Sequence, residues 1–155
     1  MKLDQLDLSS FPALQRLRVA DVMTANPITV QHDSHVSDAV ELMDRHHIQH
    51  LPVVKDGKLA GLMSERHVRD AMPSILTLKD PAARRKSLQL TRVNQIWVEN
   101  VETIGPEAPL VAAIRTMRRV HASSLPVVQG GALAGIITAG DLLSVLEAVL
   151  ARAGG

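Results

Sequence analysis

Along this chain, stretches in which apolar residues have helical spacing alternate with short apolar runs typical of β-strands. Apolar residues first recur at every third or fourth position, the spacing of one helix face, and two short apolar, β-rich runs follow. Asp56-Gly57 separates these runs and is typical of a two-residue hairpin turn. Ser34 and Ser64 stand where helix N-caps are expected. The predicted elements are a strand at 28–30, a helix at 36–47, strands at 51–54 and 59–63, and a helix beginning at 65.

The same order returns in the second half of the chain. Leu51-Pro52-Val53-Val54 recurs 74 residues later as Leu125-Pro126-Val127-Val128, and eight of the eleven positions in 51–61 are identical in 125–135. The second set of predicted elements is a strand at 102–104, a helix at 109–121, strands at 125–129 and 132–137 around Gly130-Gly131, and a helix at 139–151 capped by Thr138. The sequence thus predicts an α/β (α+β) fold with two β-α-β-β-α repeats at 19–72 and 93–151, a lead-in at 1–18 and a linker at 73–92.

A repeat of this length buries only a marginal core alone, so we expect the two to pack together about a pseudo-twofold axis. Such an axis makes two related clefts between the repeats. Gly61 and Gly135 close the repeated glycine segment, and two interpretations of them stay open. They either shape the hairpin or let a ligand or a second backbone approach closely.

Composition narrows the function. The 155 residues are 46% hydrophobic with a net charge of +1, which is typical of a packed globular protein. The chain has no cysteine, which excludes disulfides, thiolate zinc sites and iron–sulfur clusters. Phe11 and Trp97 are the only aromatic residues, so stacking platforms for single-stranded nucleic acid are not expected. Acidic residues near the start and the lack of a long apolar run predict a cytoplasmic location without a membrane span.

The doubled Leu-Pro-Val-Val strand, glycine turn and Gly-hydrophobic-hydrophobic-Ser/Thr segment resembles a tandem cystathionine-β-synthase (CBS) domain pair, as in stand-alone CBS proteins. The segment 19–27 is similar to the family's opening segment, and 135–141 to its nucleotide motif. The resemblance implies a regulatory module rather than an enzyme. It implies AMP, ADP, ATP or S-adenosylmethionine as a regulatory ligand between the repeats, with no required cofactor. It also implies a homodimer and a regulated partner protein in trans.

Thr138 and Asp141 have the spacing that suits a nucleotide. A hydroxyl at a helix start lies beside free N–H groups that favour phosphate, and a carboxylate one turn later can accept both hydroxyls of a ribose. Alternatively, Thr138 only caps the helix and Asp141 only complements its dipole. In the first repeat Ser64 is present, but His67 stands where Asp141 stands. A histidine does not offer two anionic acceptors, although its charged form can contact phosphate, so we expect unequal clefts.

The resemblance adds further cleft residues from the repeat opposite each helix. It places Pro27, Ile28, Gln49 and His50 beside Asp141, and Ser123 and Ser124 beside Ser64 and His67. It also places Val101 and Glu102 there, where the carboxylate of Glu102 would oppose a phosphate.

Two competing signals remain. His46, His47 and His50 have spacings that ligate a metal if a helix continues through them, but a strand is expected to open at Leu51, and we expect no metal site. The basic linker and the cluster Arg115, Arg118 and Arg119 fit either a solvated surface or an anion contact, and no recognition motif for nucleic acid accompanies them. The alternative function is a structural dimerisation module that binds no nucleotide.

Overall fold

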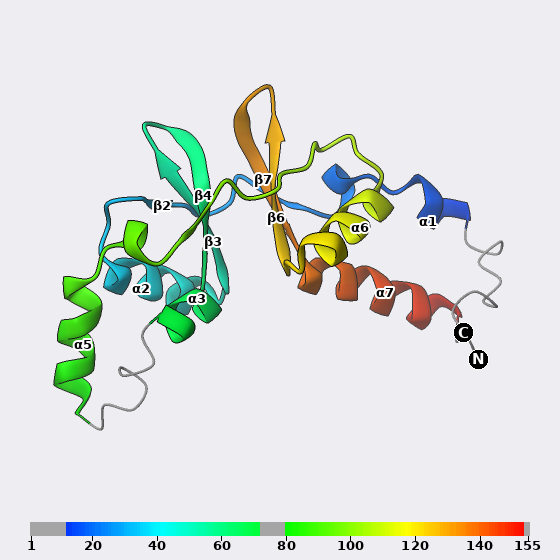
Figure 1. Ribbon diagram of the computed structural model, residues 1–155. Coiled ribbons are helices and arrows are strands. Elements are labelled where there is room, and N and C mark those ends of the chain that lie inside the picture. Colours follow the sequence, from blue (N-terminus) through cyan, green and yellow to red (C-terminus); the bar gives the residue numbers. More distant parts are fainter. Residues whose placement is uncertain (1–11, 72–79, 154–155) are drawn as a thin grey trace.

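Two small β-sheets stand at the centre of the molecule, and the helices of each half gather round one of them (Figure 1). The computed structural model describes residues 12–71 and 80–153. The first sheet has the order β2 (Val30–Gln31), β3 (His50–Lys55), β4 (Lys58–Ser64), β5 (Val98–Glu99), and the second has the order β1 (Thr24–Ala25), β7 (Ala132–Thr138), β6 (Ser124–Gln129). The helices are α1 (Pro12–Arg16), α2 (Val36–His46), α3 (Glu65–Ala71), α5 (Pro81–Leu90), α6 (Leu110–Val120) and α7 (Ala139–Ala153). The expected mixed α/β fold is confirmed.

Each half of the chain contributes one short strand to the sheet of the other half. β1 precedes the first repeat's sheet in the chain but pairs with β7, and β5 pairs with β4. Val19 is fully buried in the core of the second half, and Val93 is fully buried in the core of the first half. The two repeats are therefore linked by exchanged strands and by core residues that each half contributes to the other.

Gly61 and Gly135 allow this exchange. A Cβ atom on Gly61 would overlap the carbonyl oxygen of Val98, and one on Gly135 would lie 2.6 Å from Met23 Sδ and 2.9 Å from the carbonyl oxygen of Thr24. Real Cβ atoms do not approach other atoms so closely. Of the two interpretations left open by the sequence, the structure shows the close approach of a second backbone, that of the exchanged strand.

The repeat extends to unusual backbone conformations. β3 and β4 form a hairpin whose register shifts between Val53 and Val54, and β6 and β7 shift at the equivalent Val127 and Val128. Residues with positive φ also recur 74 positions apart. They are Asn26 and Asn100, His47 and His121, Asp56 and Gly130, and Gly57 and Gly131. His47 and His121 end α2 and α6 in the left-handed conformation and turn the chain toward the loops before β3 and β6.

Four local expectations need correction. The strand expected at 28–30 is Val30–Gln31, because only these two residues pair with β3. The N-cap of α2 is His35, not Ser34, and its backbone N–H donates to Asp38 Oδ2 at 3.2 Å. The strand expected at 102–104 is reduced to a single parallel bridge between Ile104 and Val127, because the neighbouring strand positions are not paired. The segment expected as a linker contains α5, which Asp80 caps and which packs on α2.

Candidate functional site

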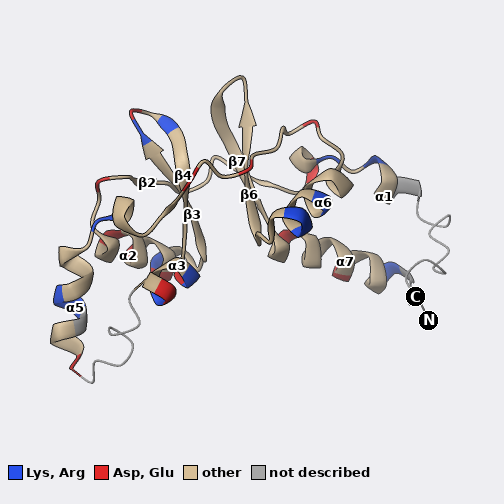
Figure 2. Ribbon diagram, viewed as in Figure 1, with Lys and Arg blue, Asp and Glu red and all other residues tan. Residues whose placement is uncertain are grey.

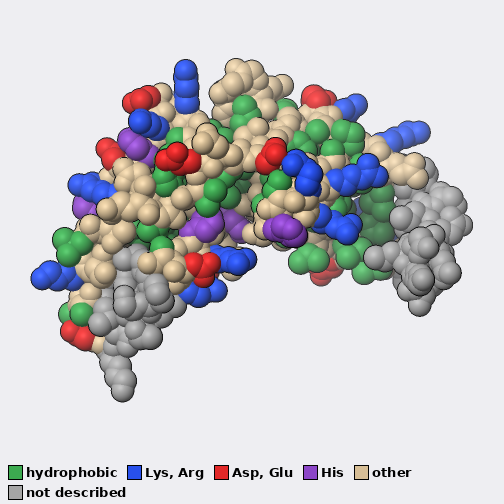
Figure 3. Space-filling model, viewed as in Figure 1, with side chains coloured by type: hydrophobic (Ala, Val, Ile, Leu, Met, Phe, Trp, Pro, Cys, Tyr) green, Lys and Arg blue, Asp and Glu red, His purple; other side chains and the backbone are tan. Residues whose placement is uncertain are grey.

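A cavity of about 1020 Å³ lies between the two halves, which is at the upper end of the range for small-molecule sites. Its wall comes from the segment after β1, the ends of α2 and α6, and the junctions of β4 with α3 and β7 with α7. Histidine side chains gather near the middle of the molecule (Figure 3). All ten residues that the sequence predicted as ligand-binding line this one cavity: Pro27, Ile28, Gln49, His50, Ser64, His67, Ser123, Ser124, Thr138 and Asp141.

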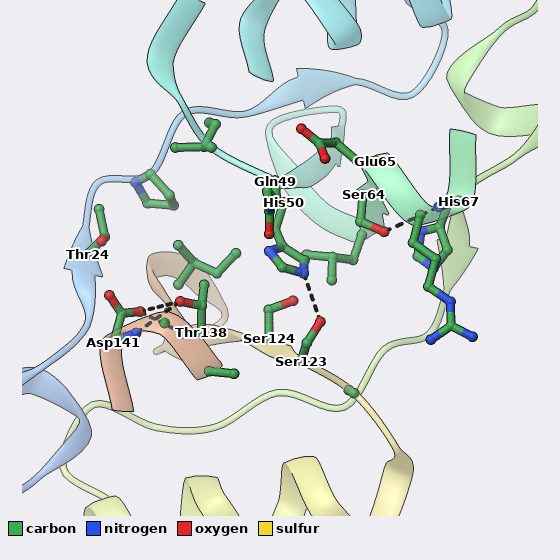
Figure 4. Close-up of a pocket in the computed structure, with 18 of the residues that line it drawn as sticks. Thr24, Gln49, His50, Ser64, Glu65, His67, Ser123, Ser124, Thr138 and Asp141 are labelled. Atoms are coloured by element: carbon green, nitrogen blue, oxygen red, sulfur yellow. Dashed lines mark hydrogen bonds between the residues drawn. The ribbon is translucent and has the colours of Figure 1, made fainter. Parts of the chain in front are cut away.

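Thr138 and Asp141 form one corner of the cavity (Figure 4). The Thr138 N–H and hydroxyl both donate to Asp141 Oδ2, at 2.7 and 2.9 Å, and the Asp141 N–H lies 3.3 Å from Thr138 Oγ1. This reciprocal capping box shows that the pair stabilises the start of α7. Within the described residues only Oδ2 is used, so the carboxylate can still accept from a ligand with Oδ1.

Ser64 and His67 form the opposite corner (Figure 4). Ser64 is buried, at 7% exposure, and its Oγ lies 3.4 Å from the His67 N–H, a weaker form of the same cap. An imidazole replaces the carboxylate here, and its Nδ1 is buried with no hydrogen-bond partner among the described residues. The two corners therefore occupy equivalent places but present different chemistry.

Two loops join the corners across the pseudo-twofold axis. The Glu65 N–H donates to the Gln49 carbonyl at 3.2 Å, and the Ala139 N–H donates to the Ser123 carbonyl at 2.8 Å, which fixes the loops in equivalent positions. His50 Nε2 then lies 2.9 Å from Ser123 Oγ and links the two halves directly. The two clefts expected from the sequence are parts of one cavity, because residues of both corners and of both loops line it.

Two histidines of the cavity, His50 and His67, have lowered pKa values. Burial lowers the pKa of His50, and the nearby His67 lowers it further. Burial also lowers the pKa of His67; Asp70 opposes this shift and Arg66 adds to it. Burial dominates in both cases because it removes water from the charged imidazolium. An anion bound beside these rings would act in the opposite direction.

Two expected residues lie elsewhere. Val101 and Glu102 are not among the residues that line the cavity, and Glu102 Oε1 instead pairs with Arg119 Nη2 at 3.2 Å. Glu102 therefore lies outside the cavity wall, and the predicted repulsion of a phosphate by its carboxylate is wrong. The exchange of β1 brings Asn26, Pro27 and Ile28 to the cavity wall, whereas the equivalent residues 100–102 after β5 do not line the cavity.

Several wall residues were missed by the sequence reasoning. They are Thr24, Asn26, His47, Leu62, Glu65, Arg66, Arg69, Asp70, His121, Ile136, Ala139 and Gly140. The 74-residue shift could have indicated His47 and His121 as a pair, because both follow a helix and precede an expected site loop. Figure 2 shows the charges that α3 adds, and only the packing of that helix places them at the cavity.

Within residues 12–71 and 80–153, no group of three or more histidine, aspartate or glutamate side chains is placed to hold a metal ion. The hypothesis that His46, His47 and His50 share a metal fails because α2 ends at His46 and β3 begins at His50. No described helix is long and apolar enough to cross a membrane.

Comparison with known proteins decides the family. The family model described as CBS domain matches residues 19–74 and 98–148. The chain belongs to the CBS domain family. It is also 32% identical over 137 residues to a CBS domain-containing protein of Dictyostelium discoideum, covering 87% of this chain and 94% of that protein. CBS domain proteins are generally regulatory rather than catalytic.

Solved structures agree with this assignment. The structure of CBSX2 in complex with AMP matches with a TM-score of 0.71 and 26% identity, covering 85% of this chain and 97% of that one. The CBS domain pair of protein MJ0100 in complex with 5'-methylthioadenosine and S-adenosyl-L-methionine shares the fold, with a TM-score of 0.70, 22% identity, and 85% and 97% coverage. The chain also matches much longer proteins, such as a homoserine O-acetyltransferase of Methanococcoides burtonii, of which it spans 24%.

Proposed function

We propose that this CBS pair is a regulatory sensor that binds one adenosyl nucleotide in the cavity between its repeats. The observation that carries the proposal is the Thr138–Asp141 corner, where a helix start and a carboxylate face the cavity opposite residues of the other repeat. Solved CBS pairs contain AMP or S-adenosylmethionine, which supports the same class of ligand. AMP, ADP, ATP and S-adenosylmethionine are the candidates, and no further cofactor is required.

The ribose is assigned to the Asp141 corner. Asp141 Oδ2 already accepts from the Thr138 N–H and hydroxyl, so Oδ1, which has two free lone pairs, accepts from the two ribose hydroxyls. Pro27 and Ile28, which belong to the exchanged segment, give an apolar edge against which the adenine ring packs. Gln49 and His50 supply polar groups beside the phosphate.

The ligand acts by changing how the two repeats are arranged relative to each other. Its contacts come from both repeats, so it stabilises arrangements in which those contacts are made and disfavours the others. A ligand shifts such an equilibrium only by its difference in affinity for the two arrangements. A partner protein in trans, in the cytoplasm, reads the difference, and the chain itself carries out no reaction.

Titration calorimetry with AMP, ADP, ATP and S-adenosylmethionine tests the proposal. We expect saturable binding of one ligand per chain and a loss of affinity of about tenfold or more in Asp141→Ala, because a charge-assisted hydrogen bond is removed. Asp38→Ala is the matched control, since Asp38 also accepts an N–H at a helix start but does not line the cavity. If the two substitutions change nucleotide affinity equally, Asp141 only caps α7 and does not bind the ligand.

The second candidate is a structural dimerisation module. It is favoured by Leu143, Leu146 and Leu150, which are exposed along α7. An absence of binding heat with every adenosyl ligand, on folded protein, would select this candidate.

A further inference from the structure

The two corners of the cavity differ by one decisive exchange of side chains. Asp141 presents a carboxylate, whereas His67 presents an imidazole whose Nδ1 is buried with no hydrogen-bond partner among the described residues. A ribose needs acceptors for two neighbouring hydroxyls, and an imidazole does not provide them. A protonated imidazole is instead a donor that suits phosphate oxygen. The Ser64–His67 corner is therefore chemically mismatched to a second nucleoside.

The space between the corners is polar and contains one buried hydroxyl without a hydrogen-bond partner among the described residues. Ser124 is 3% exposed, lines the cavity, and its hydroxyl has no hydrogen-bond partner within the described residues. A buried hydroxyl without a partner costs free energy that a bound group recovers. His50 and Ser123 lie beside it and bond to each other. Figure 4 shows these three side chains between the Asp141 corner and the Ser64–His67 corner.

The charges around the imidazoles admit an anion. On α3, Arg66 pairs with Asp70 at 3.3 Å, and Arg69 makes no ion pair among the described residues. Glu65 on the same helix and Asp141 on α7 oppose an anion, while His50 on β3 and the exposed His47 and His121 favour one when protonated. The opposing charge of Asp141 stands at the ribose corner. Thus the cavity is anionic at one end and can become cationic at the other.

We propose that the Ser64–His67 corner is a phosphate subsite, so that the cavity takes one nucleoside polyphosphate lying from Asp141 to His67 rather than two nucleosides. This inference rests on the proposed function and names the ligand class more narrowly. The ribose occupies the Asp141 corner, the chain of phosphates passes Ser124 and His50, and the terminal phosphate accepts from His67. No bond is made or broken.

Binding is coupled to proton uptake. Partial burial lowers the pKa of His50 and of His67 in the free protein, and a neighbouring phosphate favours their charged form. The complex then holds more protons than the free protein, so affinity for a polyphosphate rises as the pH falls through the ordinary histidine pKa of about 6.5. AMP does not reach the histidine corner and shows a weaker dependence.

Titration of the wild-type chain and His67→Gln with ATP and AMP tests the subsite. We expect one ligand per chain, tighter binding of ATP than of AMP, and a loss of about tenfold in ATP affinity in His67→Gln with AMP unchanged. His46→Gln is the control, because His46 ends α2 outside the cavity wall. Two AMP molecules per chain, or equal changes for ATP and AMP, would overturn the proposal.

A second measurement needs no variant and no nucleoside. Inorganic tripolyphosphate is added to the wild-type protein while the ring nitrogen resonances of the histidines are followed by NMR. We expect His50 and His67 to shift toward the protonated form and His46 to stay unchanged. If this occurs but no nucleotide binds, the subsite stands and the proposed sensor function fails. If nucleotides bind and the rings do not respond, the sensor stands and the subsite fails.

Discussion

At the residue scale, the two ends of the cavity differ in chemistry because equivalent positions of the two repeats carry different side chains. The repeat places a helix-start hydroxyl, Ser64 or Thr138, at each end of one cavity. The third residue after that hydroxyl then decides the chemistry, a carboxylate at Asp141 and an imidazole at His67. Burial lowers the pKa of His67, so its imidazole favours the neutral form. A bound anion or a lower pH favours the charged form.

The lowered pKa values of His50 and His67 predict a pH-dependent stability. In the unfolded chain these histidines bind protons at their ordinary pKa of about 6.5. Below that pH the unfolded state holds more protons than the folded state, so the free energy of unfolding falls as the pH falls. Urea unfolding at pH 7.5 and 5.5 measures the loss. The double variant His50→Gln/His67→Gln is expected to lose less stability than the wild type, and an unchanged loss would contradict the assignment.

At the element scale, the exchanged strands hold the two repeats together and shape the site. β1 reaches the second sheet and leads directly into Asn26, Pro27 and Ile28 on the cavity wall. Gly61 and Gly135 lie against the exchanged strands β5 and β1 and allow each strand to approach the backbone of the other sheet closely. A change in this contact therefore affects both the cohesion of the two halves and the position of Pro27 and Ile28 on the cavity wall.

Gly135→Ala tests this role. The added methyl group would meet Met23 Sδ at 2.6 Å and the Thr24 carbonyl at 2.9 Å, so we expect the free energy of unfolding to fall by about 1–3 kcal/mol. Gly105→Ala is the matched control, because a Cβ there meets nothing within 4 Å. Denaturant unfolding of both variants gives the comparison. A wild-type midpoint for Gly135→Ala would show that β1 moves aside without cost.

At the scale of the whole molecule, α7 carries a stripe of exposed apolar side chains. Leu143, Leu146 and Leu150 are 65%, 51% and 62% exposed and recur at helical spacing. An antiparallel second α7, centred between Leu146 and Glu147, sets Leu143 of one copy against Leu150 of the other. This stripe is therefore self-complementary, as a twofold interface requires. In the first repeat Arg69 stands at the position of Leu143, so the two repeats differ here too.

We therefore expect a homodimer that depends on this stripe. Leu146→Lys places two charges at the centre of the interface and is expected to shift the chain to monomer in sedimentation velocity. Leu90→Lys is the control, because Leu90 is 72% exposed on α5, away from this helix. Dissociation by both substitutions, or by neither, would place the contact elsewhere.

The sequence by itself determined the repeat, the order of the main elements in each half, and ten residues that line the cavity. The 74-residue shift aligns strands, turns and helix starts, because hairpin chemistry, N-caps and apolar periodicity are local signals. The hydroxyl and carboxylate of Thr138 and Asp141 could be predicted for the same reason, since both belong to one helix turn. His67 could be seen as the exception from the alignment of the two halves alone.

Only the tertiary structure decided where the repeats exchange strands and that the two clefts are one cavity. Pairing of β1 with β7 and of β5 with β4 depends on contacts far apart in the chain, which no local pattern encodes. The same packing brings Arg66, Arg69 and Asp70 to the cavity and leaves Val101 and Glu102 outside it. The pKa shifts of His50 and His67 follow from burial, a property of the folded chain and not of its sequence order.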